Sequence, residues 1–117
     1  MFLMRTVKNK KIILRKMQQV TYTPKIHLLV CINDRSKRED PMPSCGPTMT
    51  AEHVKELKLW IRQQGRTGVV IATKCQCLGL CNAEGGVACI YPSGRFFKGI
   101  KSVDELKNII VDEMNRL

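Results

Sequence analysis

The sequence predicts a small α/β fold, a mixed β-sheet flanked by helices. Its 117 residues match the length of one domain, and an apolar content of 44% is sufficient for a hydrophobic core. Short β-type apolar runs alternate along the chain with segments of helical periodicity. Because no apolar stretch approaches the roughly 20 residues of a membrane-spanning helix, we expect no membrane insertion.

Charge divides the chain into two parts. The net charge is +10, and the first 24 residues contain six basic residues and no acidic ones, whereas the remainder contains 14 basic and 10 acidic residues. Pro24 disfavours helix at the residue before it. We therefore expect residues 1–24 to form a basic, flexible N-terminal extension and residues 25–117 to form the folded domain.

The first half of this domain predicts a strand, a loop and a helix. The run His27–Ile32 is apolar and short, which is typical of a buried strand. Residues 33–50 are polar, contain three prolines and include Cys45, so they predict a loop. Thr50 is a suitable N-cap for a helix over 51–64. Apolar residues recur there at helical spacing: Val54, Leu57 and Ile61.

A strand, a cysteine-rich segment and a hairpin follow. The strand is predicted over 69–72 from its β-branched residues, and it leads into the cysteine-rich segment 74–81. Residues 87–91 and 95–98 predict two more strands, joined by the turn-forming Pro-Ser-Gly at 92–94.

The chain ends in a predicted helix from residue 103 onwards. Ser102 and Glu105 have the spacing of a capping box. One face is apolar, formed by Val103, Leu106, Ile109, Ile110, Met114 and Leu117. The acidic pairs at 104–105 and 112–113 are expected on the solvated face of this helix.

This order of elements predicts the strand directions. Two strands joined through a helix should be parallel, and the hairpin should add antiparallel strands. The same arrangement occurs in thioredoxin-like domains. The loops that follow the first two strands should then lie at one end of the sheet.

Six cysteines occur in a chain without a recognisable secretory signal. We expect a cytoplasmic, reducing location, where metal or cluster ligation is a better explanation than a disulfide framework. Four of the cysteines lie near the end of the first predicted strand or in the loops that follow the first two strands: Cys31, Cys45, Cys77 and Cys81. Thiolates are soft donors, and four of them complete two tetrahedral irons bridged by two sulfides.

These motifs carry a family resemblance. Cys31 and Cys45 have thirteen residues between them. They are followed by the motif Cys77-Leu-Gly-Leu-Cys81 and then by Val-Ala-Cys-Ile-Tyr-Pro-Ser-Gly-Arg. With this pattern, residues 26–113 resemble the thioredoxin-like 2Fe-2S ferredoxins. The Cys-Leu-Gly-x-Cys motif is also similar to the ferredoxin subunit of NADH:quinone oxidoreductase, which has a much closer first pair. The resemblance implies a one-electron carrier rather than an enzyme, with one 2Fe-2S cluster per chain. It further implies a homodimer, with unidentified redox proteins as electron donor and acceptor.

The resemblance also implies the ligands: Cys31, Cys45, Cys77 and Cys81. Cys75 departs from the family pattern and is an alternative to Cys77, but only Cys77 has the Leu-Gly-x-Cys register. Cys89 lies inside a predicted strand, and we interpret it as a small buried residue.

Two further expectations concern the surroundings of the cluster and the partner surfaces. The turn at 83–86 is rich in glycine, and its backbone N–H groups are expected to donate to cluster sulfurs. One of the adjacent Phe96 and Phe97 must point outward from a regular strand, which makes it a candidate dimer contact. Basic residues near the cysteines predict an acidic patch on the redox partner. They are Arg35, Lys37, Arg38 and Lys74.

Two alternatives belong to other functional classes. The first is a structural zinc module whose basic arm binds nucleic acid. The thirteen residues between Cys31 and Cys45 count against it, because paired zinc ligands are usually closer in sequence. An aromatic content of 5% also gives little support for stacking on nucleic-acid bases. The second is a thiol redox protein. The chain has no Cys-x-x-Cys motif, which counts against it, and the closer pair Cys75-Gln-Cys77 would have to be the redox-active one. We interpret His27 and His53 as structural residues rather than metal ligands.

Overall fold

The computed structural model describes residues 17–35, 44, 46, 48–79 and 84–117. The elements follow in the predicted order: β1 (Ile26–Cys31), α2 (Ala51–Gln63), β2 (Val70–Cys75), β3 (Gly86–Tyr91), β4 (Arg95–Ile100) and α3 (Val103–Asn115). Residues 17–24 form neither a helix nor a strand, and 1–16 lie outside the described ranges, so the proposed extension stays a prediction. No helix in the described ranges is long and apolar enough to cross a membrane.

The four strands form one mixed sheet in the order β2-β1-β3-β4. β1 pairs with β2 in parallel and with β3 in antiparallel orientation, and β3 pairs with β4 in antiparallel orientation. Both predicted relations are confirmed. The central position of β1 explains its apolar sequence, because it has a neighbour on each side and a helical layer over one face.

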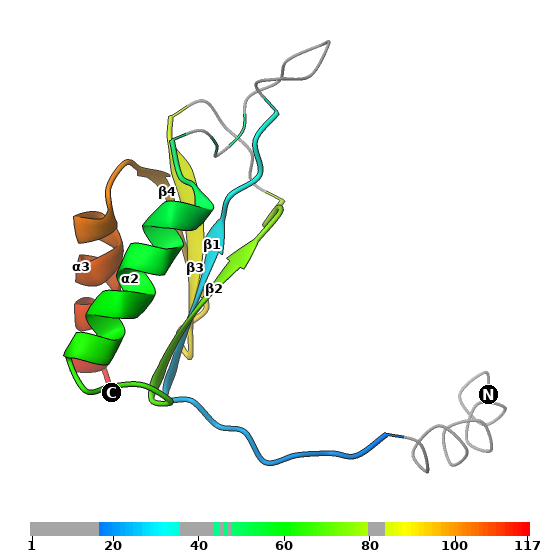
Figure 1. Ribbon diagram of the computed structural model, residues 1–117, viewed down its shortest axis with the longest axis vertical. Helices are drawn as coiled ribbons and strands as arrows, with labels where there is room; N and C mark the ends of the chain where they lie inside the picture. The colour runs from blue at the N-terminus through cyan, green and yellow to red at the C-terminus, as the bar shows by residue number, and fades with distance from the viewer. Residues whose placement is uncertain (1–16, 36–43, 45, 47, 80–83) are drawn as a thin grey trace, which may run out of the picture.

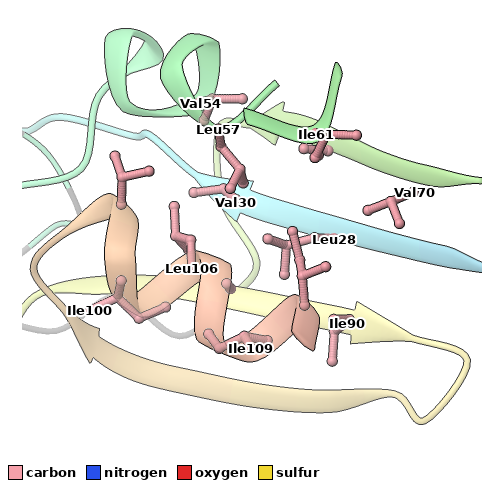
Figure 2. Packing of buried hydrophobic residues seen from close by; sticks show 14 of the residues in the cluster. Leu28, Val30, Val54, Leu57, Ile61, Val70, Ile90, Ile100, Leu106 and Ile109 are labelled. Atoms are coloured by element: carbon pink, nitrogen blue, oxygen red, sulfur yellow. The ribbon is translucent and has the colours of Figure 1, made fainter. Parts of the chain in front are cut away.

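Helices α2 and α3 cover the same face of the sheet (Figure 1). Alternate residues of β1, including Leu28 and Val30, point toward the helices and are fully buried. Leu57 of α2 and Leu106 of α3 are also fully buried and meet these strand residues in the core (Figure 2). At roughly 25 cal/mol per Å² of apolar surface removed from water, this layer is the main source of stability.

Local hydrogen bonds determine where the helices begin. The backbone N–H of Thr50 donates to Nδ1 of His53 over 3.0 Å, so a histidine takes the place that glutamate usually has in a capping box. The backbone N–H of Glu105 donates to the Ser102 hydroxyl over 3.3 Å. The Glu105 carboxylate accepts from the backbone N–H of Lys101. His53 therefore has the structural role that the sequence predicted.

The expectation that Glu113 lies on a solvated face is wrong, since this residue is only 1% exposed. Its carboxylate accepts from the Ser93 backbone N–H and the Ser93 hydroxyl, each over 2.8 Å, and from Nη2 of Arg95 over 2.6 Å. Glu113 lies one turn after the buried Ile110 and therefore faces the sheet. A buried carboxylate is tolerated there because the β3–β4 turn supplies its hydrogen bonds.

The face of the sheet opposite the described helices carries aromatic residues. Phe97 packs against the core, whereas Phe96 is 51% exposed, which confirms that one of the two rings points outward. Tyr91 is 45% exposed and belongs to the neighbouring strand β3. We call Phe96 and Tyr91 the aromatic pair of the open face.

Candidate metal centre

The ends of β1 and β2 place two cysteines side by side. Cys31 is the last residue of β1 and Cys75 is the last residue of β2, and the two are register partners in the parallel pairing. The backbone N–H of Ile32 continues the ladder by donating to the Cys75 carbonyl oxygen over 2.8 Å. The sequence predicted a strand ending at residue 72, so β2 extends three residues beyond that end and enters the cysteine-rich segment. Pairing with β1 stabilises this extension.

Cys31 is buried, with 1% exposure. Its Sγ donates to the carbonyl oxygen of Gln76 over 3.3 Å. It forms a small apolar group with the buried Val87, against which Cys75 and Leu78 pack. This group is separate from the core beneath the helices, and the thiol of Cys31 therefore lies among apolar neighbours at the end of the sheet.

Cys77 differs from Cys31 because it is exposed and lies two residues beyond β2. The backbone N–H of Gly79 points at it, with a distance of 3.2 Å from nitrogen to Sγ. Gly79 has φ +81°, a conformation that favours glycine, so a side chain at this position would strain the turn that brings the N–H to the sulfur. The Leu-Gly part of the motif thus supplies a donor to the thiol that precedes it.

The described part of the turn at 83–86 packs closely against neighbouring segments, and the expectation that its backbone N–H groups donate to cluster sulfurs stays a prediction. A Cβ on Gly85 would lie 2.9 Å from the Ile100 carbonyl oxygen, and one on Gly86 would lie 3.0 Å from the Cβ of Met49. These glycines allow the start of β3 to pack closely against the end of β4 and against Met49, two residues before α2. Residue 83 itself lies outside the described ranges.

Cys45 and Cys81 lie outside the described residues. The residues on either side of Cys45 are nevertheless bound to the segment that follows β1. The backbone N–H of Gly46 donates to the Asn33 carbonyl oxygen over 2.8 Å, and that of Arg35 donates to the Ser44 hydroxyl over 2.9 Å. Ser44 and Gly46 are thus attached close to the exit of β1, where Cys31 lies.

Burial raises the pKa of the Cys75 thiol, and the neighbouring thiols of Cys31, Cys77 and Cys89 raise the same pKa further. Each of these groups would repel a thiolate at Cys75 if it were itself ionised. The Cys75 thiol thus lies close enough to three other described thiols to interact with them electrostatically. A bound cation would relieve this repulsion.

Two basic side chains belong to the same end. Lys74 is exposed, and Arg35 is partly buried. The Nε of Arg35 is buried and has no hydrogen-bond partner within the part of the chain that the structure describes. An anionic group bound by the cysteines would give this guanidinium both a partner and a compensating charge, so the residues present fit an anionic iron-sulfur cluster. Lys37 and Arg38 lie outside the described ranges.

The described ranges contain no group of three or more metal-ligating side chains that could hold an ion. Two of the four predicted ligands are outside those ranges, so the four-thiolate set stays a prediction. Cys89 is fully buried in β3, as expected for a structural residue. His27 shares a hydrogen bond of 2.9 Å between its Nε2 and the Thr73 hydroxyl, which is consistent with a structural role in β1.

The fold has counterparts among solved structures. The wild-type thioredoxin-like [2Fe-2S] ferredoxin from Aquifex aeolicus superposes with a TM-score of 0.61 at 22% identity, over 75% of this chain and 84% of that chain. One cysteine-to-serine variant of that ferredoxin gives a TM-score of 0.60 at 21% identity, over 73% of this chain and 82% of that chain. A second such variant gives a TM-score of 0.62 at 20% identity, over 76% of this chain and 86% of that chain.

No protein-family model matches the chain. No curated protein matches it at a significant level. The shared features are the mixed four-stranded sheet and the two helices on one of its faces. The chain therefore has the thioredoxin-like fold of these ferredoxins.

Proposed function

We propose that this protein is a one-electron carrier that binds one 2Fe-2S cluster through the thiolates of four cysteines. The proposed ligands are Cys31, Cys45, Cys77 and Cys81. When bound, such a cluster accepts and donates single electrons. The proposal includes no independent catalytic site and a cytoplasmic location.

One observation carries the proposal: two loops with cysteines leave adjacent parallel strands at the same end of the sheet. β1 brings Cys31 there, and β2 brings the segment with Cys77. The hydrogen bond from Gly46 to Asn33 holds Gly46, the residue after Cys45 in the sequence, near the exit of β1. The likeness to structures named as [2Fe-2S] ferredoxins supports the same interpretation.

The residues at this end have distinct roles in the proposal. The buried Cys31 holds its side of the site away from water, whereas the exposed Cys77 brings the other side to the surface, where a redox partner can approach. The Gly79 N–H withdraws electron density from the Cys77 sulfur. Hydrogen bonds to ligand sulfurs and nearby cations such as Arg35 stabilise the more negative state and raise the reduction potential.

The measurement that tests this proposal is a metal analysis of the full chain purified without oxygen. We expect two irons and two sulfides per chain, with visible absorbance that bleaches when dithionite is added. A colourless protein that contains zinc would contradict the proposal and favour the zinc module. A metal-free protein whose thiols exchange with disulfide substrates would favour the thiol redox protein.

Charge supports an acidic partner surface. Lys74 is exposed at the end of β2, and Arg35 lies at the same end of the sheet. Attraction between these cations and an acidic redox protein would speed association at low salt. We expect the rate of electron transfer from an acidic donor to fall as ionic strength rises, measured by stopped-flow absorbance. A rate that rises instead would contradict this surface.

We also propose a homodimer whose contact includes the aromatic pair of the open face, Phe96 and Tyr91. Their exposed rings are the kind of side chain that is enriched in interfaces. Phe96→Ser should shift the mass measured by light scattering from dimer toward monomer. Leu59→Ser is the matched control, because Leu59 is 50% exposed on α2, away from this face. A monomeric wild-type chain would contradict the proposal.

A further inference from the structure

Cys75 is a thiol that the proposed ligand set leaves unused, although it lies beside one of the ligands. It is the register partner of Cys31 on the adjacent parallel strand. Register partners on neighbouring strands point their side chains to the same face of a sheet. Both residues also belong to one apolar group with Val87 and Leu78, so the two thiols face the same small space.

The backbone geometry of this pair suits a disulfide. Neighbouring strands lie about 4.8 Å apart. Disulfides join residues whose Cα atoms are separated by about 4.4–6.8 Å. Cys31 and Cys75 each end their strand, so small adjustments at this position leave the pairing of the preceding residues intact.

We propose that Cys31 and Cys75 form a disulfide when the chain holds no cluster and encounters a low-molecular-weight disulfide such as glutathione disulfide. The bond would occupy Cys31, one of the proposed ligands, and would prevent cluster assembly until a thiol reduces it. The second part of this inference rests on the proposed function, whereas the formation of the disulfide does not.

The chemistry is two successive thiol–disulfide exchanges. The Cys75 thiolate attacks one sulfur of glutathione disulfide, which forms a mixed disulfide and releases one glutathione thiolate. The Cys31 thiolate then attacks the Cys75 sulfur, which forms the Cys31–Cys75 bond and releases the second glutathione. Both cysteine thiols are oxidised, glutathione disulfide is reduced to two glutathiones, and the two thiol protons pass to these leaving groups.

The other described thiols are placed less well to pair with Cys31. Cys77 lies two residues beyond the end of β2 and outside the strand ladder. Cys89 is on β3, where its register partner on β1 is Leu29 rather than Cys31. The sheet therefore holds Cys75 in a fixed position opposite Cys31, which raises the effective concentration of this pair above that of the alternatives.

The test is disulfide mapping of the full chain after anaerobic removal of iron. The cluster-free protein is equilibrated with glutathione disulfide, its remaining thiols are alkylated, and it is digested with trypsin. Cleavage after Lys25, Arg35, Lys74 and Arg95 places Cys31 in peptide 26–35 and Cys75 in peptide 75–95. Fragmentation between Cys75 and Cys77 then identifies the sulfur bound to Cys31. We expect Cys31–Cys75 to make up most of the disulfide formed by Cys31.

A Cys31 that stays reduced, or that pairs mainly with Cys45, Cys77 or Cys81, would overturn the inference. Cluster uptake then tests its second part, using iron and sulfide supplied without added thiol. The oxidised wild type should lose uptake and regain it after dithiothreitol, whereas Cys75→Ser should retain uptake after the same oxidation. An equal loss of cluster uptake in both proteins would overturn the inference that this disulfide prevents cluster assembly.

Cys89→Ser is the control for the loss of any one thiol, and it should behave as the wild type does in both measurements. Circular dichroism confirms that each variant is folded, and Cys75→Ala replaces Cys75→Ser if the serine does not fold. If the reduced wild type takes up no cluster, the proposed function fails, while the disulfide map still decides whether the pair forms.

Discussion

The two ends of the sheet are built in different ways. At the end where β1 and β2 finish, Cys77 is exposed and accepts a hydrogen bond of 3.2 Å from the Gly79 backbone. At the opposite end, the β3–β4 turn is bound to α3 through Glu113, which accepts three hydrogen bonds of 2.6–2.8 Å from Ser93 and Arg95. Arg95 also forms an ion pair of 2.9 Å with Asp112.

This difference follows from the strand directions. Parallel β1 and β2 carry both cysteine segments to one end, and the β3–β4 turn lies at the other because β3 runs antiparallel to β1 (Figure 1). The polar network can thus hold the turn against α3 without restricting the cysteine segments. We expect variants at the turn to change stability and variants at the cysteine end to change cluster binding.

The largest expected effect is at the cysteine end. Cys77→Ser should remove most of the bound cluster, because a serine hydroxyl is a harder and more weakly acidic ligand than a thiolate. Cys89→Ser should leave the cluster spectrum unchanged, since Cys89 is buried inside β3. Iron content and visible absorbance measure both variants. Equal losses in the two proteins would show that the assigned ligand register is wrong.

The next effect is at the turn. Glu113→Ala should lower the free energy of unfolding by about 2–4 kcal/mol, because removal of one partner leaves the Ser93 and Arg95 donors without their buried acceptor. Chemical denaturation of the cluster-free chain measures this change. Iron bound per folded molecule should stay at the wild-type value. A Glu113→Ala variant with normal stability and reduced iron content would contradict the expectation that the turn affects stability rather than cluster binding.

Acidification should remove the stability that Glu113 gives to the turn, whereas neutral pH should preserve it. Burial alone would raise the pKa of Glu113, but hydrogen bonds from Arg95 and Ser93 outweigh it and hold the pKa below its usual value. A lowered folded-state pKa stabilises the protein fully above the ordinary glutamate pKa of about 4.3. That stability is lost as the pH falls through the folded-state pKa. Denaturation at several pH values should show a steeper acid loss in the wild type than in Glu113→Gln, and parallel profiles would contradict this role.

The smallest expected effect concerns the donor to Cys77. Gly79→Ala places a side chain at φ +81°, which costs about 1–2 kcal/mol and should turn the N–H away from the sulfur. We expect a lower reduction potential in a redox titration of the loaded protein. Gly68→Ala is the control, because Gly68 has φ +85° and an added Cβ has no neighbour within 4 Å at either position. The same potential shift in both variants would show that backbone strain, and not the hydrogen bond, causes it.

Local patterns in the sequence were sufficient for the elements and for the expectation that one of Phe96 and Phe97 points outward. Helical spacing and caps identified α2 and α3, and the β-type runs identified four strands in the correct order and relative directions. Such features depend on neighbours a few residues away, and the chain carries them before it folds. The resemblance supplied the expected ligands, of which Cys31 and Cys77 lie at the same end of the sheet.

Tertiary structure alone decided the features that depend on residues far apart in the chain. Glu113 is buried because Ser93 and Arg95, about twenty positions earlier, supply its donors. Cys75 belongs to a strand because β1 pairs with it. Gly85 and Gly86 approach the end of β4 closely, and the Gly79 N–H donates to the Cys77 sulfur. Periodicity along one segment contains no information on such partners, since strand pairing and burial arise only when distant segments meet.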